Sequence, residues 1–122
     1  MNELTVAAAR LRRGGVAVFP TDTVTGLGCL ARSAVGVAAL FALKGRARAK
    51  PLILFVRDLA QAEAVTGRLP ARVRRVLGWC WPGPLTAVLP LRARFPRGVG
   101  RAGTVGVRIP AHPIPRALLA LA

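Results

Sequence analysis

Hydroxyl and carboxyl side chains are concentrated in residues 20–28, with the sequence Pro-Thr-Asp-Thr-Val-Thr-Gly-Leu-Gly, directly after a short apolar run. Threonine hydroxyls donate and accept hydrogen bonds, and the carboxylate of Asp22 accepts them. Loops that follow buried strands often bind ligands, so Thr21 and Thr23 are candidates for holding a small polar substrate. The alternative is an ordinary turn in which Asp22 bonds its own backbone, and the residue types alone favour this alternative.

Both lysines of the chain, Lys44 and Lys50, fall in one basic segment together with Arg46 and Arg48. All other basic positions are arginine, which suggests that lysine is used here for a chemical reason. A lysine supplies a compact point charge and an arginine a planar fork, so Lys44 and Arg46 could converge on a polyphosphate. The alternative is a solvated basic loop, and the segment contains no Walker phosphate-binding motif.

Arg108 interrupts the apolar run 104–109, which we expect to form a strand. A buried arginine needs an anionic partner, and the whole chain has only 4 acids. A substrate carboxylate would satisfy Arg108, and a structural acid is the alternative. His112, which lies between an alanine and a proline, is more typical of a cap or turn than of a catalyst.

Two tryptophans, Trp79 and Trp81, follow a cluster of arginines at positions 72, 74 and 75. Aromatic rings interleaved with basic residues can stack nucleic-acid bases. The interpretation that we favour from the sequence is that both tryptophans pack in the core and that the arginines are solvated.

The composition sets limits on the class of protein. The length of 122 residues suggests one domain, and a hydrophobic content of 53% is too high for a disordered tail. Lys and Arg number 19 against 4 Asp and Glu, and the formal net charge of +15 favours polyanionic partners. An arginine-rich coding bias with a solvated face is the alternative.

Several kinds of chemistry are excluded. With 2 cysteines and 1 histidine, the chain lacks the ligands of a structural zinc site. The few acids argue against a glycosidase carboxylate pair, and the presence of one serine, Ser33, argues against a Ser-His-Asp triad. No apolar run approaches the ~20 residues of a membrane span, and the N-terminal charge order is unlike that of a secretory signal. We therefore expect a cytoplasmic protein with no membrane partner.

The elements that must position these residues alternate without strict order, which indicates a mixed α/β layer fold. Ser33 and Asp58 are expected helix caps, and Val73, Val76 and Leu77 are expected to face the core. Residues 20–28 are expected to form a loop. Helices are expected at 3–13, 33–43, 58–67, from 70 to just before Trp81, and at 113–122, and strands at 16–19, 52–56, 85–89 and 104–109.

Four segments resemble, in order and spacing, four blocks of the YrdC family. They are Val18–Cys29, Lys44–Arg46 with Lys50–Leu52, Trp81–Thr86 and Thr104–Pro113. The similarity runs from about residue 14 to the C-terminus. It implies an α/β fold: a YrdC-like twisted mixed sheet flanked by helices, forming a single domain over residues 1–122 with a positively charged concave face.

The resemblance implies an L-threonylcarbamoyladenylate synthase. Such an enzyme forms threonylcarbamoyl-AMP and pyrophosphate from L-threonine, bicarbonate or CO2, and ATP, with Mg2+ held through the phosphates. Partner proteins then transfer the threonylcarbamoyl group to an adenosine of tRNA. The resemblance also implies binding of tRNA or double-stranded RNA. A non-catalytic RNA-binding module is therefore the alternative function, and a carbamoyl-adenylate-forming domain of the hydrogenase-maturation type is a weaker one.

The resemblance also assigns residues to two binding sets, with no side chain acting as a catalytic acid or base. The chemistry is expected to depend on positioning and electrostatics instead. Arg108 would bind the threonine carboxylate, and Lys50 would line the cavity of the ATP phosphates. The threonine and carbamate set consists of Thr21, Thr23 and Arg108, and the ATP set consists of Lys44, Arg46 and Lys50.

The chain departs from the family pattern at several positions. Thr25 replaces the usual tyrosine, Leu30 a common aspartate and Ala47 the usual proline. Family members continue with a Ser-x-Asn segment that helps to bind ATP and substrate, whereas this chain stops at Ala122. We therefore expect a domain whose C-terminal part is missing, either a fragment or a short chain of impaired activity.

Overall fold

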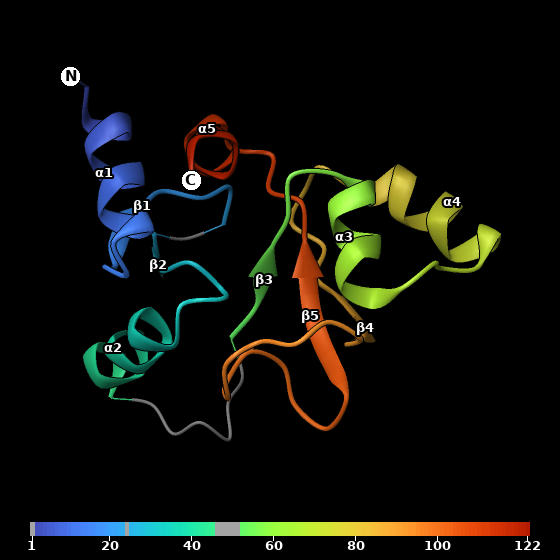
Figure 1. The fold of residues 1–122 in the computed structure, drawn as a ribbon. Coiled ribbons are helices and arrows are strands. Elements are labelled where there is room, and N and C mark those ends of the chain that lie inside the picture. Colours follow the sequence, from blue (N-terminus) through green and yellow to red (C-terminus); the bar gives the residue numbers. More distant parts are fainter. Residues whose placement is uncertain (1, 24, 46–51) are drawn as a thin grey trace.

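The computed structural model describes residues 2–23, 25–45 and 52–122. Helices and strands are mixed along the described chain without strict alternation, as Figure 1 shows. Every expected helix and strand is present in these ranges, with ends that differ by a few residues. The elements are α1 (Glu3–Arg12), β1 (Ala17–Phe19), β2 (Gly26–Gly28), α2 (Ala34–Lys44), β3 (Leu54–Phe55), α3 (Leu59–Thr66), α4 (Ala71–Cys80), β4 (Ala87–Pro90), β5 (Thr104–Arg108) and α5 (Pro113–Leu121).

The strands form two small sheets. In the three-stranded sheet, β5 lies in the centre, parallel to β3 and antiparallel to β4. The second sheet is an antiparallel pair of β1 and β2. The ring of Phe19 in β1 packs edge-on against the ring of Phe55 in β3, with centroids 6.3 Å apart. This aromatic contact joins the two sheets beside the end of β5.

The expectation of a loop over all of residues 20–28 is wrong at its end, because Gly26–Gly28 forms β2. A strand flanked by two glycines carries little strand propensity, which explains why the sequence does not indicate it. The glycines allow close packing of the Phe19 ring: a Cβ at Gly28 would lie 2.9 Å from its Cε1. The strand therefore leaves room for the ring that joins the sheets.

Local capping explains where the helices begin. Ser33 accepts a hydrogen bond from the backbone N–H of Gly36 at 3.0 Å, and Asp58 accepts one from Gln61 at 2.8 Å. These contacts confirm both expected caps. His112 caps α5, since its Nδ1 accepts a hydrogen bond from the N–H of Ile114 at 3.1 Å.

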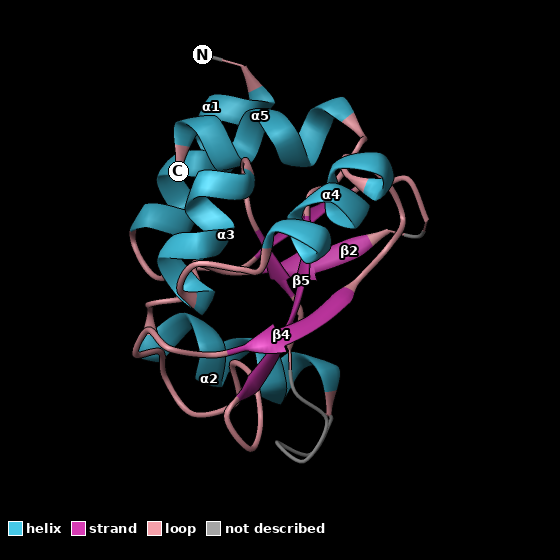
Figure 2. Cartoon of the chain, turned by 90° about the vertical axis from the view of Figure 1, so that its right-hand side faces the viewer, coloured by secondary structure: helices cyan, strands magenta, loops and turns pink. Residues whose placement is uncertain are grey.

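The apolar side chains form two clusters. The larger one fills the space between α2, α3, α4 and the three-stranded sheet, and it contains Val37, Trp81 and Val107. The smaller one packs α1 and β1 against α5 through Ala8, Leu11, Ala17 and Leu118. Figure 2 shows the result: α1 and α5 lie at one end of the molecule, α2 lies at the other, and the strands run between them.

Two expectations about α4 are wrong. Val76 is 48% exposed and Trp79 is 79% exposed, whereas both were expected to pack in the core. The helix buries only a narrow face, on which Leu77 is buried and Val73 is partly buried. Trp81, just beyond the helix, is buried as expected, and its indole N–H donates to the carbonyl of Leu85 at 2.9 Å.

No helix among the described residues is long and apolar enough to cross a membrane.

Candidate functional site

Arg108, the last residue of β5, forms the centre of a polar cluster although it is only 5% exposed. Its Nε donates to the carbonyl of Gly83 at 2.7 Å, and its Nη1 donates to Oγ1 of Thr23 at 3.3 Å. Its Nη2 forms a hydrogen-bonded ion pair with the carboxylate of Asp22. The guanidinium is therefore held from three directions, by segments far apart in the sequence.

The loop after β1 supplies the oxygen atoms on one side of Arg108. The hydroxyls of Thr21 and Thr23 lie 3.1 Å apart, and the backbone N–H of Thr23 donates to Oγ1 of Thr21 at 3.2 Å. Thr21 is half-buried and Thr23 is exposed. The buried guanidinium therefore reaches solvent through a pair of hydroxyls that can both donate and accept hydrogen bonds.

A tight turn supplies the carbonyl on the other side of Arg108. The N–H of Gly83 donates to the carbonyl of Ile109 at 2.9 Å, and the Gly83 carbonyl accepts from Arg108. A Cβ at Gly83 would lie only 2.6 Å from the carbonyl oxygen of Cys80. Because that oxygen belongs to the backbone, position 83 requires glycine for the turn to bring its carbonyl to Arg108.

An aromatic ring lies beneath the guanidinium. Phe55 and Arg108 are register partners in the parallel pair of β3 and β5, and the guanidinium carbon lies 5.5 Å from the centroid of the Phe55 ring. This distance is within the range of a cation–π contact. The pairing of β3 with β5 therefore places the Phe55 ring against the guanidinium of Arg108.

The electrostatics of Asp22 follow from its partner. Burial acts to raise the pKa of Asp22, but hydrogen bonding and charge from Arg108, with the backbone N–H groups of Asp22 and Ala111, outweigh it. The pKa of Asp22 is therefore below its ordinary value of 3.8. The Asp22 side chain is 20% exposed, so the ion pair lies at the edge of the cluster rather than deep in the core.

The structure brings together the three residues expected to form the threonine set, Thr21, Thr23 and Arg108. Of the ATP set, the described ranges include Lys44 alone. Lys44 ends α2 with an exposed side chain, and it has no hydrogen bond or ion pair within the described ranges. Arg46 and Lys50 lie outside the described residues, so their expected role stays a prediction.

The structure adds a role for Asp22 that the sequence did not favour. The sequence favoured a turn in which Asp22 bonds its own backbone, and its carboxylate does so but also pairs with Arg108. Two partners were expected for Arg108, a structural acid or a substrate carboxylate. The described structure contains the acid, Asp22. The contributions of Phe55 and Gly83 were also missed, because they depend on sheet register and on contact between distant segments.

The part of the chain that the structure describes, residues 2–23, 25–45 and 52–122, offers no metal-binding cluster. These residues contain no group of three or more His, Cys, Asp or Glu side chains that could hold a metal ion. His112 acts as a helix cap, in agreement with the sequence interpretation.

In this structure a β-strand delivers a buried arginine to a loop that carries hydroxyl groups. Comparison with known proteins identifies the family to which the chain belongs. The chain belongs to the Sua5/YciO/YrdC family, whose description is "Telomere recombination" and which matches residues 9–122.

Two relatives carry the same name. The chain is 47% identical over 113 residues to a threonylcarbamoyl-AMP synthase of Halorhodospira halophila, and 39% identical over 119 residues to one of Bacillus subtilis. These matches cover 92% and 96% of this chain but only 59% and 34% of the relatives. The chain therefore spans between one third and three fifths of the length of these proteins.

Solved structures share the fold. Sua5 of P. abyssi, crystallised with L-threonine, is 39% identical with a TM-score of 0.90, and the match covers 97% of this chain and 35% of that chain. YciO of E. coli is 27% identical with a TM-score of 0.85, with 97% and 58% coverage. The YrdC-like α/β fold expected from the sequence is thus confirmed.

Proposed function

We propose that this chain is the synthase domain of an enzyme that forms L-threonylcarbamoyladenylate from L-threonine, bicarbonate or CO2, and ATP. The observation that carries the proposal is the buried Arg108, whose guanidinium meets the hydroxyl of Thr23 at a solvent-facing loop. The shared name of the relatives and the threonine-bound Sua5 structure support the choice of substrate.

Threonine carries the groups that this cluster can recognise. Its carboxylate would pair with Arg108, which presents several N–H donors in a fixed plane. Its hydroxyl and its carbamate oxygens would exchange hydrogen bonds with Thr21 and Thr23. Asp22 already occupies part of the guanidinium, so the substrate carboxylate would compete with Asp22 or use the N–H groups that face Thr23.

The reaction asks little acid–base chemistry of the protein. The amine of threonine adds to CO2 and loses a proton to give a carbamate. A carbamate oxygen then attacks the α-phosphorus of ATP. The bond between the α-phosphorus and the oxygen that bridges the α- and β-phosphates breaks, and pyrophosphate leaves. The protein must align the carbamate with the α-phosphorus and stabilise the negative charge that accumulates on the leaving pyrophosphate.

Positive charge for the phosphates would come from Lys44, Arg46 and Lys50. The formal net charge of +15 would favour the approach of a polyanion such as ATP. The described side chains form no metal cage, so a magnesium ion would be held mainly by the ATP phosphates, as is usual for this ion. Its contribution would be to neutralise charge on those phosphates.

The direct test is an assay of pyrophosphate release from ATP with L-threonine and bicarbonate, together with mass detection of the adenylate. We expect release to require all three substrates and to fall at least tenfold in Lys44→Ala. Arg13→Ala, which removes an exposed arginine at the end of α1, is the matched control and should leave the rate unchanged. Pyrophosphate release that does not depend on threonine would contradict the proposal.

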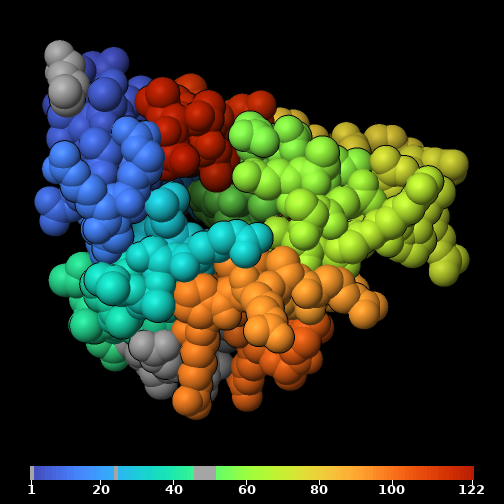
Figure 3. All heavy atoms as spheres, viewed as in Figure 1, coloured from blue at the N-terminus to red at the C-terminus, as the bar shows by residue number. Residues whose placement is uncertain are grey.

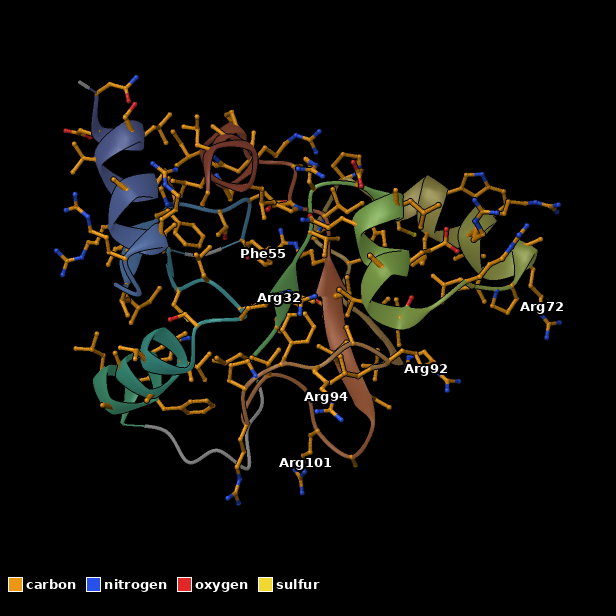
Figure 4. All side chains as sticks on the ribbon, viewed as in Figure 1. Arg32, Phe55, Arg72, Arg92, Arg94 and Arg101 are labelled. Atoms are coloured by element: carbon orange, nitrogen blue, oxygen red, sulfur yellow. The ribbon has the colours of Figure 1, made fainter. Side chains whose placement is uncertain are left out.

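A second candidate function is RNA binding without catalysis, with transfer RNA or a double-stranded RNA as the partner. Exposed arginines at positions 92, 94 and 101, which Figure 4 shows around the lower end of β5, favour it. It predicts duplex binding that weakens steeply with salt in the absence of any adenylate formation. Equal affinity for unrelated polyanions would reduce this binding to nonspecific attraction.

A further inference from the structure

The outward face of α4 carries a row of exposed side chains that neither the core nor the Arg108 cluster uses. Arg72, Arg75, Val76 and Trp79 follow one another at the helical spacing i, i+3, i+4 and i+7, and all are exposed. Side chains at this spacing lie on one face of a helix, here over a length of about 10 Å. We call these four residues the α4 stripe.

Trp79 has no structural task in the described chain. Its side chain is 79% exposed, whereas Trp81, only two residues later, is 7% exposed and bonded to Leu85. Leu77 and Val73 make the core contacts of α4, and they lie on another face of the helix, about 120° around it from the stripe. The indole of Trp79 therefore leaves a large, flat aromatic face open to a partner.

The stripe is also positively charged without compensation. Neither Arg72 nor Arg75 has a hydrogen bond or ion pair with any described residue, whereas Arg74, between them, pairs with Glu63 at 3.6 Å. Figure 3 shows α4 projecting from the side of the molecule, and Figure 4 shows Arg72 extending away from the body at the start of the helix. The two guanidinium groups therefore remain available to anions.

We propose that the α4 stripe binds a single-stranded segment of nucleic acid, with an unpaired base stacked on Trp79 and neighbouring phosphates on Arg72 and Arg75. Nucleic acid supplies a planar π face and a negative charge at adjacent positions, which is the combination that the stripe presents. An acidic peptide would match the arginines but not the indole. A second copy of this chain would bring like charges together.

The site is separate from the proposed synthase site. In Figure 1, α3 and α4 lie on one side of the three-stranded sheet, and the hairpin of β1 and β2 that carries Thr23 lies on the other. The inference therefore goes beyond the proposed function. Loss of binding at the stripe would leave pyrophosphate release unchanged, and an inactive enzyme could still bind nucleic acid.

The test measures fluorescence anisotropy of a labelled 12-nucleotide oligouridine RNA titrated with the chain at several salt concentrations. Trp79→Ala should weaken binding about tenfold, and Trp79→Phe should restore most of it, because base stacking needs only an aromatic face. Quenching of tryptophan emission by the RNA should disappear in Trp79→Ala, in which Trp81 alone remains. Both variants should keep the wild-type circular dichroism, since residue 79 is exposed.

Charge at the stripe is tested by a matched pair. Arg75→Gln should reduce the slope of log affinity against log salt by about 0.7, the value for one single-strand phosphate contact. Arg13→Gln removes an exposed arginine at the end of α1, on the other side of the molecule, and should reduce the slope much less. A 12-base-pair RNA duplex, whose bases are already paired, should bind Trp79→Ala and wild type equally.

Three results would overturn the proposal. The first is an oligouridine affinity that Trp79→Ala leaves unchanged. The second is an equal decrease in the salt slope for Arg75→Gln and Arg13→Gln, which would mean that RNA affinity depends on net charge alone. The third is competition by polyglutamate as strong as competition by unlabelled RNA, which would point to an acidic protein partner.

Discussion

At the scale of single residues, Arg108 presents a buried positive charge whose counterion is one loop acid. Taking a guanidinium out of water is costly, and Asp22, Thr23 and the Gly83 carbonyl offset that cost. The cluster is thus a structural element before any substrate arrives. It also keeps an arginine in place next to solvent-facing hydroxyls, which a binding site for a small carboxylate requires.

Removing the charge of Asp22 should destabilise the fold. We expect Asp22→Asn to lower the free energy of unfolding by about 2 kcal/mol, less than for a fully buried pair because the side chain is 20% exposed. Urea unfolding at pH 7 measures this loss. Asp58→Asn, at an exposed pair with Arg57 where asparagine can still cap α3, should change little. Equal effects of the two variants would contradict a special role for the Arg108 pair.

The same pair predicts how stability depends on pH. The folded-state pKa of Asp22 lies below its ordinary value of 3.8, so the folded state binds this proton more weakly than the unfolded state does. The pair should contribute fully above about pH 4, and its contribution should be lost as pH falls through the lowered pKa. The N–H of Gln61 likewise lowers the pKa of Asp58, which adds to acid sensitivity in the same range.

Comparison with Asp22→Asn isolates the Asp22 contribution. The variant should lose less stability than wild type when pH is lowered from 5 to 2, as followed by thermal unfolding. Glu3→Gln, at an exposed acid with no hydrogen bond or ion pair in the described ranges, is the control and should follow wild type. Parallel acid profiles for wild type and Asp22→Asn would show that the pair does not set this dependence.

At the scale of elements, two glycines of neighbouring segments should respond in opposite ways to the same change. Gly83→Ala would place a Cβ 2.6 Å from the Cys80 carbonyl and move the turn that holds Arg108, whereas a Cβ at Gly78 in α4 meets nothing within 4 Å. We expect Gly83→Ala to destabilise by about 2 kcal/mol and Gly78→Ala to stabilise by about 0.8 kcal/mol. Denaturant unfolding of both variants measures the difference, and a neutral Gly83→Ala would show that the turn tolerates side chains.

Element positions follow from the sequence where their causes are local. The caps at Ser33 and Asp58 and the buried strand at β5 depend on neighbours in the chain, so composition and spacing predict them. The strand β2 could not be predicted, because its glycines are explained by the ring of Phe19 across the hairpin. The exposure of Trp79 could not be predicted either, since helical spacing alone does not say how wide a face of α4 the core covers.

In the candidate site, too, the sequence predicts features with local causes but not contacts between distant segments. Thr21, Thr23 and Arg108 were singled out from residue types and family resemblance, and the structure brings them together. The pairing of Asp22 with Arg108 joins residues 86 positions apart, so no local pattern reveals it. The expected convergence of Lys44 with Arg46 and Lys50 stays a prediction, because two of these residues lie outside the described ranges.

At the scale of the whole molecule, the contact of Phe19 with Phe55 links the two sheets. Phe19 packs against the smaller cluster, and its ring meets Phe55, which lies beneath Arg108. We expect a double-mutant cycle of Phe19→Leu and Phe55→Leu to give a coupling energy of about 1 kcal/mol in urea unfolding. Strict additivity would show that the sheets are joined by other contacts.

The central claim is that Arg108, held by the loop after β1, receives the carboxylate of L-threonine. Isothermal titration of L-threonine into the wild-type chain and into Arg108→Lys measures it most directly, since lysine keeps the charge but loses the planar fork. We expect saturable binding to wild type and at least tenfold weaker binding to Arg108→Lys, with both proteins folded by circular dichroism. Equal affinities, or an affinity for L-threonine no higher than for L-alanine, would contradict it.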